Sequence, residues 1–343
     1  MKDKQNKGWS DKQIHTGKNV GIVIGRFSPF HLGHAKLIQT ALQNSDRLVI
    51  LLGSAGRARD IKNPWNELDR VAMLNSIVHE YNLNGTKIRY ESIRDHYKDE
   101  QWLIEVKTKV RHHIEPNDQV TLYGNDKDHS TYYLNLFPDW KLVNVDNYLD
   151  NLNATKIREF IFEGQIESAK EFLPHGVYDY LTHWIQSDDY GILHREYEHL
   201  KDYKKQFEGL PYDPFFVTVD AVITYRGHVL TIKRKAMPGL GLMAMPGGFI
   251  KTHETLLDGI KSIVKKKTGI TLSNDWLKRT HVFDRPNRSL RGRTITHVFR
   301  FDLPVKTKDY PNDSCQWIDF ADVAIYSNTF FEDHAMILQE MLK

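Results

Sequence analysis

The sequence predicts two domains, an α/β domain built on a parallel sheet and a following α+β domain. Short apolar segments alternate with amphipathic segments between residues 20 and 185, a pattern typical of a parallel sheet covered by helices on both faces. After Pro214 the pattern changes to closely spaced strands with few helices, which indicates a second, mixed fold. A chain of 343 residues is long enough for two domains of ordinary size.

The domain boundaries follow from changes in composition along the chain. Residues 1–19 are polar and rich in lysine, and we expect them to form a flexible tail. We expect the first domain over residues 20–185, a helical connector over 186–210 and the second domain over 211–343. Two prolines between residues 211 and 214 mark the junction between connector and second domain.

Bulk composition excludes several classes of protein. Apolar residues make up 40% and charged residues 27%, as in globular domains that fold in water. A net charge of +3 is too small to indicate nucleic-acid binding, and no run of 18 apolar residues predicts a membrane span. The single cysteine, Cys315, excludes an internal disulfide and fits a reducing cytoplasm, so we expect it to be a small buried side chain. A homo-oligomer is compatible with the sequence, which does not determine the oligomeric state.

In the first half, apolar periodicity predicts the individual elements. We expect strands at residues 20–25, 47–52, 87–93, 119–123 and 141–145, and helical stretches around residues 102–112 and 131–136. A helix after residue 33 buries a face made by Leu37, Ile38, Ala41 and Leu42. A further helix is expected to open at Asn63-Pro64, with Asn63 as its cap and an apolar face of Leu68, Val71, Leu74 and Val78.

The first predicted strand runs through a loop into a helix at residues 25–34, Gly-Arg-Phe-Ser-Pro-Phe-His-Leu-Gly-His. Such a junction directs free backbone N–H groups and the positive end of a helix dipole at one point. Arg26, His31 and His34 lie within nine residues there, and Gly33 lets a phosphate chain approach the backbone. The alternative is a surface loop that carries two histidines. The combination of Arg26 with the His-x-Gly-His spacing favours a phosphate site.

A second group of polar residues opens a helix at residues 153–158, Asn-Ala-Thr-Lys-Ile-Arg. A side-chain oxygen at a helix start can bind a phosphate as well as cap the backbone. Thr155, Lys156 and Arg158 add a hydroxyl and two cations to the cap Asn153. Taken alone, the segment is equally well explained as an ordinary helix start, and its pairing with the first motif makes it a candidate phosphate site.

These two segments resemble the His-x-Gly-His nucleotidyltransferase superfamily, and residues 25–34 are most similar to the archaeal-type nicotinamide mononucleotide (NMN) adenylyltransferases. The resemblance implies a Rossmann-like domain that makes NAD and pyrophosphate from NMN and ATP, with Mg²⁺ accompanying ATP. Asn153 stands where the family usually has a serine, which leaves one hydroxyl contact open. The resemblance implies catalytic roles for Arg26, His31, His34, Thr155 and Arg158. It also implies that ATP or phosphate is bound by Gly25, Phe27, Gly33, Lys62, Asn153 and Lys156.

Recognition of NMN is expected at the ends of two later strands. Archaeal-type family members place an acidic or amide side chain and a tryptophan near the segment that begins at Arg94. A tryptophan ring is suited to stacking on the cationic nicotinamide. The alternative for Trp102 is a plain core residue at helical spacing. The resemblance implies NMN binding by Asp95, Asp99, Trp102, Gly124 and Asn125.

The second half resembles a Nudix domain of the ADP-ribose branch. Residues 245–254 are similar to the start of a Nudix box, in which a glycine precedes a glutamate by six residues and the following helix ends at a glycine. These family residues are Gly248, Glu254 and Gly269. The later arginines Arg285, Arg288 and Arg291 lie in a segment that resembles the ADP-ribose branch and are candidates to meet phosphates or ribose.

The Nudix box departs from the family pattern at the positions that would bind metal. Ile263, Lys266 and Lys267 stand where the family has glutamates. Pyrophosphate cleavage there needs carboxylates that hold magnesium and position a water molecule, and protonated lysines cannot ligate a metal. We therefore expect no metal bound by the protein in this box and no ADP-ribose pyrophosphatase activity. The alternatives are a noncatalytic ADP-ribose or nucleotide sensor, residual hydrolysis, or a first domain that adenylylates another phosphate acceptor.

Overall fold

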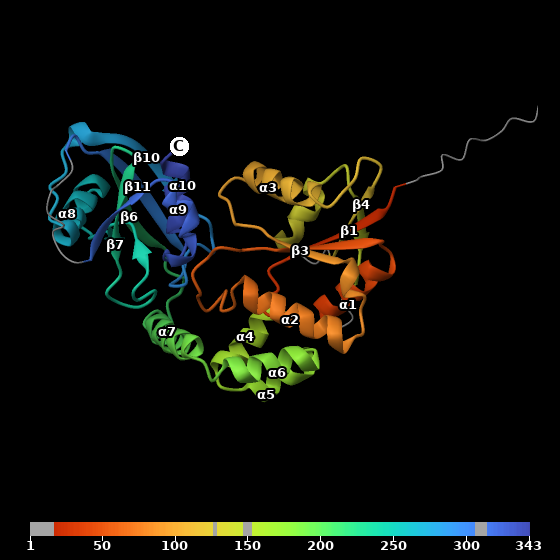
Figure 1. Cartoon of the computed structure of the whole chain (residues 1–343). Helices are drawn as coiled ribbons and strands as arrows, with labels where there is room; N and C mark the ends of the chain where they lie inside the picture. The colour runs from red at the N-terminus through yellow and green to blue at the C-terminus, as the bar shows by residue number, and fades with distance from the viewer. Residues whose placement is uncertain (1–16, 126–128, 147–152, 306–313) are drawn as a thin grey trace, which may run out of the picture.

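The computed structural model describes residues 17–125, 129–146, 153–305 and 314–343. It contains two domains side by side, joined at one end by a long helix (Figure 1). This confirms the predicted α/β architecture with a parallel first sheet and a mixed second sheet. Most of the tail predicted over residues 1–19 lies outside the described residues.

The first domain is built on a five-stranded parallel sheet. Its strands are β1 (Asn19–Gly25), β2 (Arg47–Leu52), β3 (Ile88–Ser92), β4 (Gln119–Gly124) and β5 (Lys141–Asn144), in the order β3-β2-β1-β4-β5. The strand order changes direction between β1 and β4, and ligands of such sheets bind at the carboxyl ends of the strands near this point. The loop with the two histidines follows β1 and therefore lies at this position.

Alternating side chains of the strands bury both faces of this sheet. Val23 of β1 packs with α1 (Leu32–Gln43), α2 (Glu67–Glu80) and the helices of residues 154–184, whereas Ile22 and Ile24 pack with α3 (Asp99–Arg111). This alternation places a helical layer on each face. The strand lengths predicted from the apolar runs agree with the structure to within two residues.

The predicted start of α2 is wrong. The helix expected at Asn63-Pro64 begins at Glu67, because Asn66 caps it by accepting a hydrogen bond from the Asp69 N–H at 3.0 Å. Its buried face consequently contains Met73 and Ile77 as well as Leu74, and Leu68 is 78% exposed. The predicted helical stretch at residues 131–136 is confirmed and is a 3₁₀ helix, His129–Leu136.

A helical segment connects the first sheet to the second domain. It comprises α4 (Ala154–Phe162), α5 (Ile166–Ala169), α6 (His175–Trp184) and α7 (Asp188–Lys205). Helices α4 to α6 lie below α2, and α7 continues from them to the second domain (Figure 1). The helix α7 lies where the connector was predicted.

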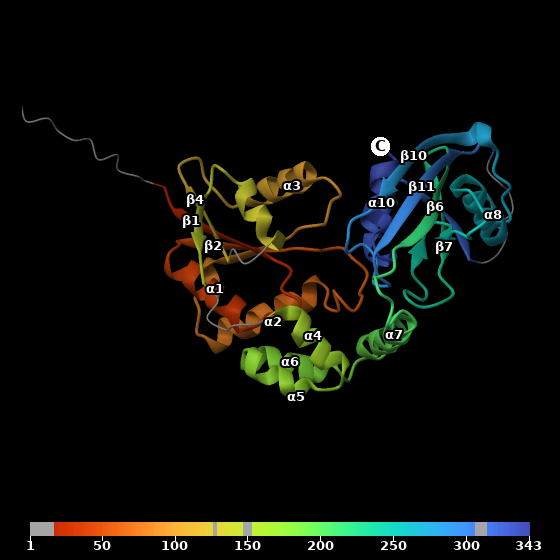
Figure 2. The ribbon, with the colours of Figure 1, turned by 180° about the vertical axis from the view of Figure 1, so that it is seen from behind.

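The second domain is a mixed sheet flanked by helices. Its strands are β6 (Phe216–Tyr225), β7 (His228–Lys233), β8 (Met243–Ala244), β9 (Gly247–Phe249), β10 (Leu277–Phe283), β11 (Thr294–Asp302) and β12 (Cys315–Asp319). Only β11 and β6 pair in parallel among these strands. Its helices are α8 (Leu256–Thr268), α9 (Asp322–Ile325) and α10 (His334–Met341). Figure 2 shows α8 and α10 on opposite sides of the sheet.

Two local predictions for the second domain are confirmed. Gly269 ends α8 with a φ of 73°, a left-handed conformation that favours glycine. Cys315 is buried in β12 and has no disulfide partner. Within the described part of the chain, no helix is long and apolar enough to cross a lipid bilayer.

Candidate active site and a second, cationic pocket

The loop between β1 and α1 is held by stacked aromatic rings. Phe27 has a positive φ of 49°, and its ring stacks on that of Phe30 with centroids 4.5 Å apart. A Cβ atom on Gly25 would lie 2.8 Å from the Phe27 ring, so this position requires glycine. The buried guanidinium of Arg70 donates hydrogen bonds to the carbonyls of Arg26 (2.7 Å) and Gly53 (2.6 Å). Sequence reasoning missed Arg70, since a single arginine on a helix has no distinctive pattern.

The two histidines form one stacked unit at the start of α1. Their ring centroids lie 3.6 Å apart, and the Nδ1 atom of His34 accepts a hydrogen bond from the His31 N–H at 3.3 Å. The His34 ring also meets the Phe27 ring edge to face at 4.9 Å. The helix start therefore fixes both imidazoles at the positive end of the α1 dipole, a position that favours binding of an anion.

The structure brings Arg158 and Thr155 of α4 to the same loop. The buried Arg158 guanidinium donates to the Ser28 carbonyl at 2.6 Å and to the Thr155 Oγ1 atom at 3.0 Å. Its desolvation, together with the nearby charge of Arg26, lowers the pKa of Arg158 to about 10. Arg26 is exposed, so one buried and one accessible guanidinium share this positive site.

The other predicted phosphate contacts have partners of their own. Asn153 caps α4 by accepting a hydrogen bond from the Lys156 N–H at 2.9 Å. The Lys156 ammonium lies 5.5 Å from the centroid of the Phe160 ring. Lys62 donates to the Asn287 carbonyl of the second domain at 3.4 Å. Gly33 lies in the first turn of α1, between the two histidines.

The predicted NMN-binding residues lie in different parts of the first domain. Asp95 accepts hydrogen bonds from Ser54 and Arg57, both at 3.1 Å, at the junction between the domains. Asp99 accepts from the Tyr132 hydroxyl, and the half-buried Trp102 meets the rings of Tyr133 and Phe137 edge to face. Gly124 ends β4, and the Asn125 amide donates to the Val145 carbonyl at 2.9 Å.

Tyr97 connects this segment to the second domain, a role that the sequence did not suggest. Its hydroxyl donates to Asp333, which also forms a bidentate ion pair with Arg288, with both distances at 2.9 Å. Burial raises the pKa of Tyr97, and the neighbouring Asp333 carboxylate raises it further. Arg285 donates to the Tyr97 carbonyl at 2.7 Å and lies over its ring. Two of the three predicted ADP-ribose arginines are thus engaged at the domain junction.

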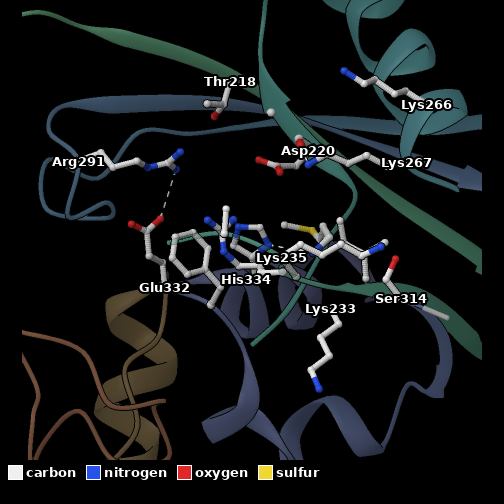
Figure 3. A pocket seen from close by; sticks show the side chains of 18 of the residues that line it. Thr218, Asp220, Lys233, Lys235, Lys266, Lys267, Arg291, Ser314, Glu332 and His334 are labelled. Atoms are coloured by element: carbon white, nitrogen blue, oxygen red, sulfur yellow. Dashed lines mark hydrogen bonds and ion pairs between the residues drawn. The ribbon is translucent and has the colours of Figure 1, made fainter. Parts of the chain in front are cut away.

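The second domain contains a cavity of about 410 Å³ at its sheet (Figure 3). Glu332 and Asp220 are the acidic residues among those that line it, and apolar residues such as Phe331 and Met245 complete its wall. Its cationic lining residues are Lys233, Arg234, Lys235, Lys266, Lys267, Arg288 and Arg291. The pocket therefore carries a strong excess of positive charge. His334 lies in it with a pKa well below its ordinary value, because burial and the surrounding cations disfavour a further charge.

The residues of this pocket do not fit a divalent metal. Glu254, the acidic residue retained from the Nudix box, pairs with Lys251 at 2.7 Å and is not among the residues that line the cavity. Ile263 packs against the apolar cluster beneath α8. Among the residues that the structure describes, no group of three or more acidic, histidine or cysteine side chains could hold a metal ion. Gly269 keeps the helix end of the Nudix pattern, and Gly248 lies in β9, where it pairs with Val219 of β6.

Comparisons with known proteins agree with these two architectures. A Cytidylyltransferase-like family profile matches residues 22–159, and a NUDIX domain profile matches residues 214–340. The nicotinamide/nicotinic acid mononucleotide adenylyltransferase of Acinetobacter baylyi is 38% identical over 177 residues, which cover 51% of this chain and 92% of that protein.

Solved structures of similar proteins extend the comparison to the whole chain. The crystal structure of a bifunctional NMN adenylyltransferase/ADP ribose pyrophosphatase from Francisella tularensis is 33% identical, with a TM-score of 0.87. The alignment covers 95% of this chain and 98% of that one. A second structure from the same organism, complexed with AMP and a manganese ion, is 32% identical with a TM-score of 0.86. The chain belongs to the family of NMN adenylyltransferases that carry a C-terminal Nudix domain.

Proposed function

We propose that the first domain transfers the adenylyl group of ATP to NMN, forming NAD and pyrophosphate. The observation that carries this proposal is the stacked pair His31 and His34 beside Arg26 and Arg158, at the carboxyl end of the central strand. Such a site collects donors and positive charge where a polyphosphate would lie. The family membership and the similarity to adenylyltransferases of known structure support the same reaction.

The reaction is a direct displacement at phosphorus. An oxygen of the NMN phosphate attacks the α-phosphorus of ATP, the bond from that phosphorus to the bridging oxygen breaks, and pyrophosphate leaves with the electron pair. Catalysis of this kind depends on positioning and charge stabilisation. His31 and His34 would hold the phosphates through the transition state, and Arg26, Thr155 and Arg158 would neutralise the leaving pyrophosphate. Mg²⁺ bound to ATP would supply further positive charge to the phosphate oxygens beside these residues.

The nicotinamide end of NMN would be recognised by the segment that follows β3. Asp95, Asp99 and Trp102 remain the candidates there, with Gly124 and Asn125 at the end of β4. Trp102 also packs on Tyr133 and Phe137, so the core interpretation and the NMN interpretation both remain open for it. Lys62 and Lys156 stay candidates for phosphate contacts, although each has another partner in this structure.

A panel of phosphate acceptors tests the proposed activity. Purified protein with ATP and Mg²⁺ is offered NMN, nicotinic acid mononucleotide, 4′-phosphopantetheine or flavin mononucleotide, and pyrophosphate release is measured. We expect pyrophosphate release with NMN and no release with the pantetheine and flavin phosphates. Release with one of those phosphates and none with NMN would contradict the proposal and favour another transferase of this superfamily.

For the second domain, we propose binding of ADP-ribose without hydrolysis. The cationic pocket supports binding, and the lack of a fitting metal site among the described residues argues against cleavage. The similar protein from Francisella tularensis is named an ADP ribose pyrophosphatase as well as an adenylyltransferase, so residual hydrolysis is the competing hypothesis. The cytoplasmic location expected from the sequence stays a prediction.

A further inference from the structure

Lys267, at the end of α8, extends toward Asp220 inside the pocket of the second domain (Figure 3). Its ammonium donates a hydrogen bond to the Gly247 carbonyl of β9 at 2.5 Å. Desolvation lowers the pKa of Lys267 from its ordinary value, and the charge of Asp220 offsets part of this decrease. The ammonium of this lysine of the Nudix-like box therefore lies beside a backbone oxygen and faces a carboxylate inside the pocket.

Without the Lys267 ammonium, the Gly247 carbonyl and the Asp220 carboxylate would need another cation beside them. Asp220 is buried and accepts a hydrogen bond from the Thr296 hydroxyl at 2.5 Å. A Cβ atom on Gly247 would lie 1.8 Å from an oxygen of Asp220, so only a glycine allows this carbonyl and this carboxylate to approach each other. A buried carboxylate beside a carbonyl favours a neighbouring positive charge, which Lys267 supplies.

Across the pocket, Arg291 provides a second cation with a defined position. Its guanidinium lies 3.7 Å from Glu332, donates to the Ser289 hydroxyl at 3.3 Å and lies over the Phe249 ring. Arg291 and Lys267 therefore lie on different walls of one cavity (Figure 3). A cavity of about 410 Å³ is within the size range of sites that bind nucleotides and similar molecules.

We propose that Lys267 is the built-in cation of this pocket, so that the pocket binds the diphosphate of a nucleotide without a divalent metal. The inference rests on the proposed function of the second domain and specifies how its ligand is held. Lys267 takes the place of a metal next to the phosphates, and Arg291 contacts them from the other wall. An ammonium neutralises phosphate oxygens but does not generate a metal-bound hydroxide, so the ligand is retained and not cleaved.

Calorimetric titration of the full chain with ADP-ribose tests this inference, once in EDTA and once in excess Mg²⁺. We expect the two dissociation constants to agree within about twofold. Lys267→Met should weaken binding in EDTA by roughly tenfold or more, as the loss of a hydrogen bond to a charged group does. Lys267→Arg, which keeps the charge, should stay within about threefold of the wild type.

Lys265→Met is the matched control, because Lys265 lies on the same helix and does not line the cavity. It should bind ADP-ribose as the wild type does, and thermal melting of each variant verifies folding. Lys267→Glu should make binding dependent on Mg²⁺, since it places a carboxylate where the family has one. Wild-type binding that is absent in EDTA, no binding under either condition, or full affinity in Lys267→Met would overturn the inference.

The proposed absence of hydrolysis is decided by a separate readout. Release of AMP from ADP-ribose by the wild type would contradict the proposed function of the second domain. The role of Lys267 would still be judged by the comparison of binding in EDTA and Mg²⁺. Hydrolysis of ADP-ribose and its binding without metal are therefore decided by different measurements.

Discussion

The two domains each present a positive site, but the origin of the charge differs. In the first domain, the histidine pair and Arg26 lie at the start of α1, where backbone N–H groups also face the site. In the second domain, Lys267 enters the pocket from the end of α8 and is bonded to a backbone carbonyl of its own domain. The first site is suited to the proposed stabilisation of charge on a reacting phosphate. The second has its cation fixed within the protein, which suits retention of a phosphate more than its cleavage.

This difference shows why positive charge alone does not identify a catalytic phosphate site. Displacement of pyrophosphate from ATP needs donors and cations around the reacting phosphorus. Hydrolysis of ADP-ribose in a Nudix fold needs carboxylates that hold a metal and a water molecule. One set of residues is present in the first domain, and the other is missing from the described part of the second.

The largest difference between the two sites is expected from a substitution of His34. We expect His34→Ala to lower the rate of adenylyl transfer about 100-fold or more, because a donor to the transition state is lost. The rate is measured at saturating NMN and ATP. His79→Ala, at the exposed end of α2, should retain the wild-type rate. A folded His34→Ala variant with near wild-type turnover would remove His34 from the mechanism.

Trp102→Ala tests whether the first domain recognises nicotinamide by stacking. Loss of the ring should raise the Michaelis constant for NMN roughly tenfold and that for ATP much less, because only NMN carries the cationic ring at this end. Steady-state kinetics with each substrate varied in turn gives both constants. Equal changes in both would support the interpretation of Trp102 as a core residue, packed on Tyr133 and Phe137.

The positive charges around His334 in the second pocket should make the free energy of unfolding depend on pH. Its pKa is lowered by burial and by Arg288, Arg234 and Arg291, whereas an unfolded histidine has a pKa of about 6.5. Below about pH 6.5 the unfolded chain therefore binds the extra proton, and stability falls as pH falls. We expect this histidine to contribute a loss of about 1.4 kcal/mol in unfolding free energy per pH unit below that point.

The variant His334→Gln removes this contribution while keeping an acceptor for the Met245 N–H, which donates to His334 Nδ1 at 3.0 Å. Unfolding of the second domain is followed by denaturation between pH 5 and pH 7.5, in the wild type and in the variant. His79→Gln, in the first domain, should keep the wild-type slope. An unchanged slope in His334→Gln would mean that His334 does not carry the effect.

The smallest effect is expected at Asn153, where the family usually has serine. Both side chains cap a helix well, so Asn153→Ser should change kcat/KM for ATP by less than about threefold. Asn153→Ala, which removes the cap, should lower the melting temperature because such a loss costs about 1 kcal/mol. A tenfold gain in Asn153→Ser would show that the family's hydroxyl makes a contact that this chain lacks.

Local patterns in the sequence predicted the elements of the sheet but not the contacts between the domains. Apolar runs and glycine positions determined the strands of the first sheet, because their side chains are buried on both faces. The start of α2 was misplaced because two asparagines, Asn63 and Asn66, offered similar caps, and tertiary packing selected the later one. The loop between β1 and α1 was predictable because its residues are adjacent in the chain.

Residues that act across long sequence separations could not be found in the same way. Tyr97 and Asp333 are 236 positions apart, and no periodicity relates a loop of one domain to a helix start of the other. The engagement of Arg288 by Asp333 likewise depended on the fold. Lys267 was recognised as a departure from the Nudix pattern, but its bond to Gly247 required the packing of α8 against β9.

We propose that this chain makes NAD in one domain and leaves ADP-ribose intact in the other. The most direct test is one reaction containing the full-length protein, Mg²⁺, NMN, ATP and ADP-ribose, followed over time by chromatography. We expect NAD and pyrophosphate to accumulate while ADP-ribose remains constant and no ribose 5-phosphate forms. Formation of ribose 5-phosphate in amounts that increase with Mg²⁺ would contradict the account of the second domain, and absence of NAD would contradict that of the first.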